Sequence, residues 1–168
     1  MSGRRKPRAP RRASNNPLAI AKAYAALLPK AEVDQELASI REAFRALREG
    51  VAIEWEWMVV VSTANISAAI DHQGVVTGLH LHIKLMQDAL QAIGSRAMET
   101  GEWRPTALYF QELDAIREGI HNFDFQVRQL SAGEYCSAQA YAIAEVRSTG
   151  GQVIESHSAS QQLALIGG

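Results

Sequence analysis

The sequence predicts an all-α protein, an antiparallel bundle of about five helices with a disordered basic N-terminal arm. Three observations support this prediction. Apolar residues recur at steps of three and four over most of the chain, which is the spacing of one helix face. Alanine, a strong helix former, supplies 27 of the 168 residues. Glycine or proline follows most of the periodic stretches and divides them into segments of helix length.

The arm comprises residues 1–16. It contains almost no large aliphatic side chain, so it cannot bury enough apolar surface to offset the entropy of ordering it. Residues 13–168 contain 11 basic and 18 acidic residues, a net charge of −7, so a mildly acidic body follows a basic arm. Six of the chain's 17 basic residues lie in the arm: Arg4, Arg5, Lys6, Arg8, Arg11 and Arg12.

The first helix is predicted at Leu18–Leu28. Asn16 can serve as its N-cap, Pro17 fits the first helical position, and Pro29 stops it. A second helix ends at Gly50, with acidic residues in its first turns and arginines in its last, as the helix dipole favours. Its inward stripe is Val33, Leu37, Ile40, Phe44 and Leu47.

The third helix is predicted at Ile53–Asp71, before Gly74. Trp55 and Trp57 stand about 200° apart on a helix, so they cannot face the same core. We expect Trp57 to be partly exposed, or covered by another segment such as helix 18–28 or by another subunit. Apolar residues on several sides of this helix suit a central helix or a dimer contact. The predicted inward residues are Trp55, Met58, Val59, Ser62, Ile66 and Ile70.

The fourth helix is predicted at Val75–Glu99, and the fifth follows an N-cap at Thr106. Residues 131–148 either continue the fifth helix or form a sixth, separated near Gly133. The bundle therefore spans residues 17–147, and residues 148–168, rich in Gly, Ser and Gln, are expected to form a flexible tail. The stripes are Leu79, Ile83, Met86, Leu90, Ile93 and Ala97, then Leu113, Ile116, Ile120, Phe123, Val127 and Leu130.

No motif in the sequence indicates an enzyme, a cofactor or a metal site. His80 and His82 would point about 160° apart on a helix, and neither H-E-x-x-H nor E-x-x-H occurs. Asp71 and His72 are neighbours whose side chains diverge, and Cys136 is expected to be a buried structural thiol. We therefore predict no catalytic residues, no metal and no cofactor. Because no apolar stretch approaches about 18 residues, we expect a cytoplasmic protein without a membrane partner.

Two sets of residues are candidates for binding. The six basic residues of the arm could contact nucleic acid or an acidic partner, because such residues neutralise phosphates without sequence preference. A solubility tail and a targeting segment are the alternatives. Trp55, Trp57 and Trp103 are candidates for a protein interface, because tryptophan is prominent in such interfaces.

Residues 36–130 carry a set of short marks. These are Leu47-Arg48-Glu49-Gly50, a tryptophan at the next helix start, Asn65, Arg96, and Thr100-Gly101-Glu102-Trp103. In these marks the chain resembles small helical accessory proteins encoded by phages and mobile elements of proteobacteria. The resemblance implies an accessory role, with anti-defence function such as anti-CRISPR activity among its forms. It assigns no catalytic residue.

The leading hypothesis is therefore a non-enzymatic interaction protein that binds a host protein or nucleoprotein complex and blocks or remodels it. The alternative is a nucleic-acid-binding regulatory protein that uses the Arg-rich arm. A third hypothesis is an enzyme or a ligand-binding bundle. A homodimer remains open, because a buried central helix would explain the third helix equally well.

Overall fold

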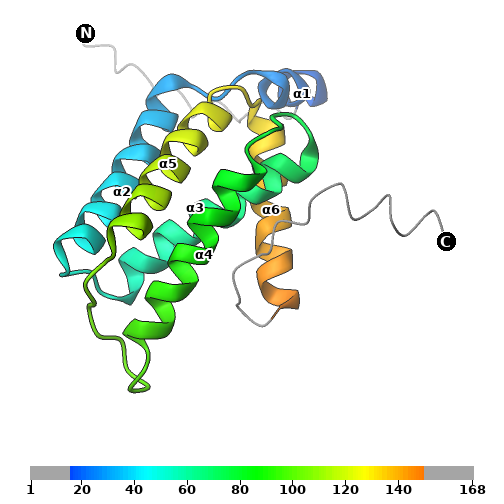
Figure 1. Ribbon diagram of the computed structural model, residues 1–168. Helices are drawn as coiled ribbons and strands as arrows, with labels where there is room; N and C mark the ends of the chain where they lie inside the picture. The colour runs from blue at the N-terminus through cyan, green and yellow to red at the C-terminus, as the bar shows by residue number, and fades with distance from the viewer. Residues whose placement is uncertain (1–15, 150–168) are drawn as a thin grey trace, which may run out of the picture.

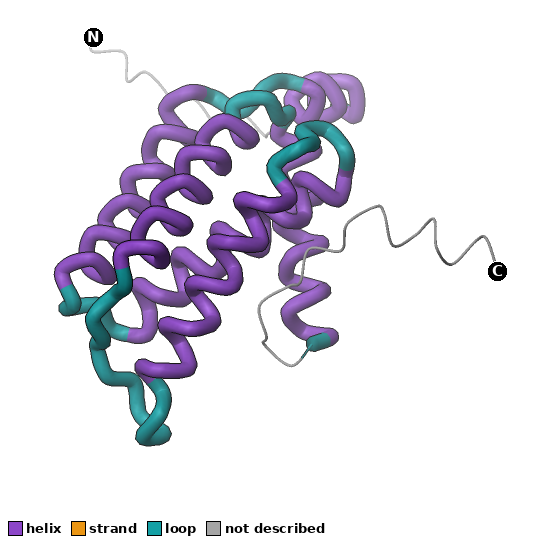
Figure 2. Tube along the Cα trace, viewed as in Figure 1, coloured by secondary structure: helices purple, strands orange, loops and turns teal. Residues whose placement is uncertain are grey.

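The computed structural model describes residues 16–149, which are all-helical (Figure 1). Six helices lie in this range rather than about five, and it contains no strand (Figure 2). The longest connection joins the fourth helix to the fifth. The helices are α1 (Pro17–Ala25), α2 (Lys30–Glu49), α3 (Glu54–Gln73), α4 (His80–Ala97), α5 (Phe110–Val127) and α6 (Ala132–Ser148).

The sixth helix is separate because a capping box begins it. The Ser131 hydroxyl accepts a hydrogen bond from the backbone N–H of Glu134, and the Glu134 carboxylate accepts one from the backbone N–H of Ser131 at 2.7 Å. This reciprocal pair satisfies two backbone donors that a helix start leaves open. Gly133, where the sequence allowed a break, lies inside α6 and close to the backbone of Tyr24.

Helix α3 is central to the fold. It contacts α2, α4, α5 and α6, and α4 and α5 also pack against each other. Because neighbours surround it, α3 buries residues on several sides, and many of them are small. Its buried residues are Val60, Thr63, Ala64, Asn65, Ser67, Ala68, Ala69 and Ile70.

The predicted inward stripe of the third helix is wrong in part. Ile70 is buried, and Val59 and Ile66 are half-buried, but Trp55, Met58 and Ser62 are exposed. The physical reason is that small residues bring the neighbouring helices close on the other sides of α3. The largest side chains of the helix therefore do not mark its buried face.

The stripes predicted for α2, α4 and α5 are buried or half-buried throughout. Two predicted helix starts are wrong. Helix α4 begins at His80 rather than Val75, and α5 begins at Phe110 rather than after Thr106. At the start of α5 the Glu112 carboxylate accepts the backbone N–H of Tyr109 at 2.9 Å, which caps the helix three residues later than expected.

One buried polar pair links α3 to α5. The Ser67 hydroxyl donates to the side-chain oxygen of Gln126, and the Gln126 amide donates back to the carbonyl of Ser67 at 3.2 Å. Both side chains are almost fully buried. Each hydrogen bond compensates for the loss of water at these atoms, so the pair aligns the two helices without an unpaired group.

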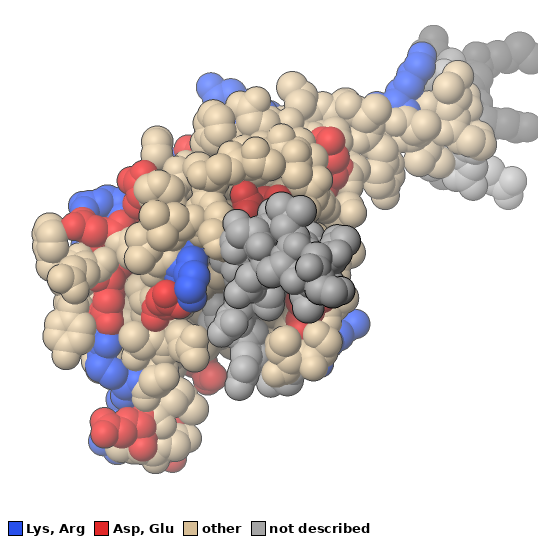
Figure 3. Space-filling view, turned by 45° about the vertical axis from the view of Figure 1, so that its right-hand side comes forward, with Lys and Arg blue, Asp and Glu red and all other residues tan. Residues whose placement is uncertain are grey.

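Helix α1 is attached to the rest by few contacts. Asn16 caps it as predicted, accepting the backbone N–H of Leu18 at 3.0 Å. It ends at Ala25 rather than Leu28, because residues 26–28 pair with residues 130–132 through two backbone hydrogen bonds. No residue of α1 is buried, and the helix stands out from the molecule (Figure 3).

Among residues 16–149, no helix combines the length and the apolar character needed to cross a membrane. The predicted arm lies outside this range except for Asn16, and the predicted tail lies outside it except for Ser148 and Thr149.

Candidate protein interface

The three tryptophans predicted as interface residues come together at one end of the molecule. At this end α2 and α4 finish and α3 and α5 begin, so the α2–α3 and α4–α5 connections meet (Figure 1). Trp55 and Trp57 lie in the first turn of α3, and Trp103 lies in the α4–α5 connection. Trp103 ties the two connections directly, because its indole N–H donates to the carbonyl of Ala52 at 2.8 Å.

Trp57 and Trp103 form the support of this end. Their ring centroids are 5.5 Å apart in a tilted arrangement, and both rings are half-buried. The Trp57 indole N–H donates to the carbonyl of Leu90 in α4 at 2.9 Å. With both indole donors satisfied, the two rings can be taken out of water and hold α3, α4 and the connections together.

Gly94 makes room for this arrangement. A Cβ placed on Gly94 would lie 2.5 Å from Cζ2 of Trp57, which is too close for real atoms. Glycine therefore lets the backbone of α4 approach the indole face.

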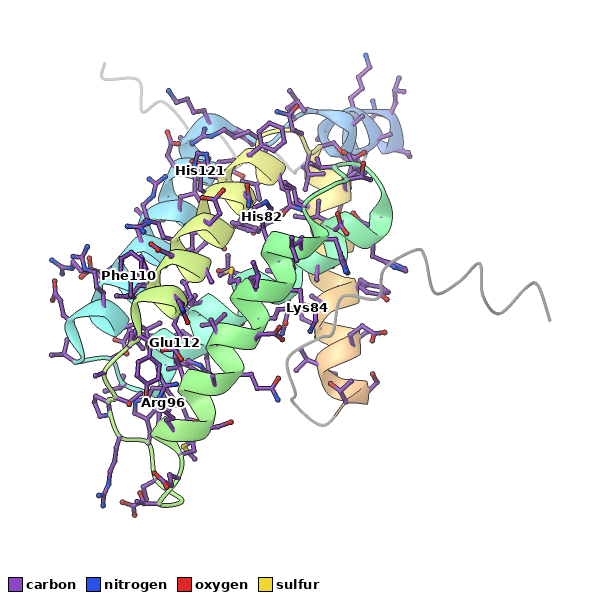
Figure 4. All side chains as sticks on the ribbon, in the orientation of Figure 1. His82, Lys84, Arg96, Phe110, Glu112 and His121 are labelled. Atoms are coloured by element: carbon purple, nitrogen blue, oxygen red, sulfur yellow. The ribbon has the colours of Figure 1, made fainter. Side chains whose placement is uncertain are left out.

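Arg96 and Glu112 connect α4 to α5 beside these rings (Figure 4). The guanidinium donates two hydrogen bonds to the carboxylate, at 2.6 and 2.7 Å. It also donates to the carbonyl of Ala107 at 3.3 Å and lies 4.7 Å from the ring centroid of Tyr109. A paired geometry of this kind fixes orientation as well as supplying attraction. The α4–α5 connection is thus fastened at Trp103, Ala107 and Tyr109.

Ionisation of Glu112 is favoured by these partners. Burial of the carboxyl opposes ionisation, but the hydrogen bonds from Arg96 and from the backbone of Tyr109, with the Arg96 charge, outweigh it. The pKa of Glu112 therefore lies below its ordinary value. The same hydrogen bond, opposed by burial, raises the pKa of Arg96. The pair is charged at neutral pH.

The helix ends and connections at this end of the molecule also carry five exposed apolar side chains, which we call together the loop-end surface. Trp55 is 66% exposed and Phe110 is 76% exposed, although both are large aromatic residues. Phe110 points outward from the first turn of α5 in Figure 4. The loop-end surface comprises Val51, Ile53, Trp55, Tyr109 and Phe110.

Exposed charged residues lie in the same helix ends and connections as the loop-end surface, and acidic ones predominate. Exposed carboxylates are supplied by Glu49, Glu54, Glu99 and Glu102, and exposed guanidiniums by Arg48 and Arg104. Figure 3 shows acidic side chains beside uncharged surface at this lower end of the molecule. Protein interfaces in general combine an apolar centre with a polar border.

Trp57 is half-buried and is covered by another segment, as expected, but that segment is the α4–α5 connection with Trp103 and not helix α1. The prediction that Trp55 points inward is wrong, because its side chain is exposed. The reason is that the α4–α5 connection brings Trp103 back onto α3, which the helix pattern alone does not show. Tyr109 and Phe110 were not singled out from the sequence. The run Leu108-Tyr109-Phe110, three large apolar residues outside any periodic stripe, was their signal.

The other candidate residues lie on α3, α4 and α6. His80 and His82 are half-buried on α4, and no group of three or more metal-ligating side chains occurs within residues 16–149. The rings of His72 and Tyr141 stack with their centroids 4.9 Å apart. Burial raises the pKa of Asp71. Cys136 is exposed on α6, so the prediction of a buried thiol is wrong.

The basic residues Arg4, Arg5, Lys6, Arg8, Arg11 and Arg12 lie outside the described residues. Residues 16–149 contain 11 basic and 17 acidic residues.

Comparison with known protein families, curated proteins and solved structures finds no match to this chain.

Proposed function

We propose that this chain is a non-enzymatic interaction protein that binds a host nucleoprotein complex through the loop-end surface and blocks or remodels it. In this proposal it is a cytoplasmic accessory protein of a phage or mobile element, with an anti-defence role of the anti-CRISPR kind. Its helices act as an antiparallel bundle that presents the surface. The observation that carries the proposal is the exposure of Trp55 and Phe110 at the same end of the molecule as the packed Trp57–Trp103 pair.

The rigidity of the support favours binding. An exposed aromatic ring on a flexible loop loses conformational freedom when a partner covers it, and that loss weakens association. Here the α4–α5 connection is held by Trp103, by Arg96 and by the capping of α5, and Trp55 and Phe110 stand in the first turns of helices. The surface is therefore organised before a partner arrives.

The charge of the border indicates the kind of partner. Four exposed carboxylates lie in the helix ends and connections at this end of the molecule, against two arginines. Complementary charge speeds encounter and rejects unsuitable partners. A protein surface that is basic and partly apolar fits this description, and proteins that hold nucleic acid expose such surfaces. Covering that surface would exclude the nucleic acid, which gives blocking by occlusion.

The test is a pull-down from a proteobacterial host lysate with the full-length chain as bait, with and without nuclease. Truncation of an interface residue at the centre of a contact typically costs 2 kcal/mol or more. Trp55→Ala and Phe110→Ala should therefore each weaken recovery of the captured complex by about 30-fold. Leu81→Ala is the matched control, because Leu81 is also exposed but lies at the other end of α4.

Three possible results distinguish the proposed interaction protein from the nucleic-acid-binding alternative. A nuclease-resistant complex that is lost with Trp55→Ala and retained with Leu81→Ala supports the proposal. Equal recovery with both variants contradicts it. Recovery of nucleic acid alone, abolished when the six basic arm residues are changed to glutamine, would instead support the nucleic-acid-binding regulator.

A further inference from the structure

A groove between α3 and α6 has no described segment in it. Its volume is about 450 Å³, and it is open to solvent on one side. Ser62, Asn65 and Ile66 of α3 form one wall, and Gln139, Ala142, Ile143 and Val146 of α6 form the other, with Arg147 at the rim. Ile143 is 52% exposed and Ile66 is half-buried, so the groove exposes aliphatic surface to water.

The groove continues a longer apolar face of α3. Trp55, Met58, Ser62 and Ile66 follow one another at steps of three and four, which places them on one side of the helix. Helix α6 packs on α3 but ends at Ser148, directly after the groove residues Val146 and Arg147. The face that periodicity marks as buried is therefore covered only in part by the described helices.

The chain itself supplies a suitable occupant. The described residues end at Thr149, three residues after Val146. Residues 150–168 therefore follow directly after the groove residues in the chain. Gly150 and Gly151 permit the change of direction that a return along α6 requires. The groove extends along α6 from Gln139 to Val146, about 10 Å at the rise of an α-helix, which a segment of this length spans easily.

The side chains of residues 150–168 match the groove in character. Ala159, Leu163 and Ile166 are spaced by four and three, the pattern of one apolar helix face. The segment has a single carboxylate side chain, Glu155, only eight residues beyond Arg147. The apolar face of this segment matches the aliphatic side chains of Ile66, Ile143 and Val146 in the groove, and its one acidic residue matches the basic residue at the rim.

We propose that residues 150–168 dock in the α3–α6 groove of the same chain, with Leu163 and Ile166 against Ile66 and Ile143 and with Glu155 near Arg147. The segment completes the cover of α3 that α6 begins. None of the residues that line the groove belongs to the loop-end surface, and this inference does not depend on the proposed function.

Native Cys136 provides the probe. It is exposed and lies on the groove side of α6, seven residues before Ile143, and it is the chain's only cysteine. A nitroxide attached to Cys136 of the full-length protein should broaden the backbone amide NMR signals of residues 159–166. The matched control carries the nitroxide at Glu118→Cys, an exposed position of α5, in a Cys136→Ser background. That label should leave the same signals sharp.

Two variants test the contacts. Leu163→Asp combined with Ile166→Asp should lower the docking equilibrium constant at least about tenfold, because docking then no longer buries the two aliphatic side chains. The signals of residues 159–166 should become sharp again. Ile143→Asp should do the same from the groove side. Gln161→Asp, in the same segment but off its apolar face, should leave the broadening unchanged.

Other occupants give different results. Mixing isotope-labelled, unmodified protein with nitroxide-labelled, isotope-free protein shows broadening only if a second copy fills the groove, and that result would overturn docking within one chain. Sharp signals for residues 159–166 in the Cys136-labelled protein would overturn it as well. Broadening that survives Leu163→Asp with Ile166→Asp would show that these side chains are not the docked ones, which also contradicts the proposal.

Discussion

The indole of Trp57 lies directly against the backbone of Gly94, so closely that a Cβ at position 94 would stand 2.5 Å from Cζ2 of the ring. This contact joins α3 to α4 at the end of the molecule where the loop-end surface is displayed. It also makes a small change at position 94 a sensitive probe of how that end is packed.

Gly94→Ala should destabilise the protein by about 1–3 kcal/mol in urea unfolding, because the added methyl group forces the indole or the helix to move. An exposed Gly→Ala change inside a helix would instead stabilise it by about 1 kcal/mol. The control is the same change in a Trp57→Leu background, where space is available and the sign should reverse. Stabilisation of the wild-type background by Gly94→Ala would contradict the packing described here.

Glu112→Gln should lower the free energy of unfolding by about 1–2 kcal/mol at neutral pH, because it removes the charge that pairs with Arg96. Arg96 is partly exposed, so water limits the loss. Glu118→Gln, an exposed change on the same helix, should have little effect. Chemical unfolding at pH 7 compares the two variants, and equal stabilities would exclude a stabilising role for the pair.

The pH dependence of stability should identify the same carboxyl. The folded-state pKa of Glu112 is lowered, so its contribution is present above the ordinary value of 4.5 and is lost as pH falls through the lower folded-state pKa. The wild type should therefore lose more stability than Glu112→Gln on going from neutral pH to below pH 4.5. Parallel stability curves for the two proteins would show that the ionisation of Glu112 is not linked to folding.

Ser131→Ala should destabilise the protein by about 1 kcal/mol, because it removes the hydroxyl that caps α6. Backbone amides in the first turn of α6 should also exchange with solvent faster. Ser137→Ala is the matched control, since Ser137 is exposed in the middle of the same helix. Unchanged exchange at residues 132–135 in Ser131→Ala would count against the capping box as the start of α6.

Ser67→Ala should cost about 1–3 kcal/mol, because the buried side-chain oxygen of Gln126 loses its donor. Adding Gln126→Leu should recover part of that loss, since no polar group is then left unpaired. Thermal unfolding of the single and double variants measures both effects. If the double variant lost more stability than the two single variants lose together, this expectation would be wrong.

The amphipathic helices were predictable because each presents one face to the core. For α2, α4 and α5 a single stripe of aliphatic residues identifies that face, and residues such as Leu37, Leu90 and Phe123 are fully buried as expected. The same logic fails for α3, where four helices approach from different sides. Ala64 and Ser67 mark its buried surface better than Trp55 does, and residue size alone could not reveal this.

The three tryptophans of the candidate interface could be chosen from the sequence only by residue type. Their gathering at one end of the molecule could not be predicted. Which of them would be exposed depends on a contact between Trp57 and Trp103, 46 positions apart in the sequence. Phe110 was missed because the capping by Glu112 sets the start of α5, and a side chain that caps from three residues downstream leaves little trace in periodicity.

The central place of α3 has a consequence for how the protein emerges from the ribosome. Of the helices that contact α3, only α2 is synthesised before it, and α4, α5 and α6 all follow. A nascent chain that has just completed α3 therefore exposes Val60 and Ile70 to the surrounding solution, where transiently uncovered apolar surface favours aggregation and chaperone binding. Among the helices of residues 16–149, α6 is the last neighbour of α3 to be translated, so their packing around α3 is completed only when residues 132–148 have left the exit tunnel.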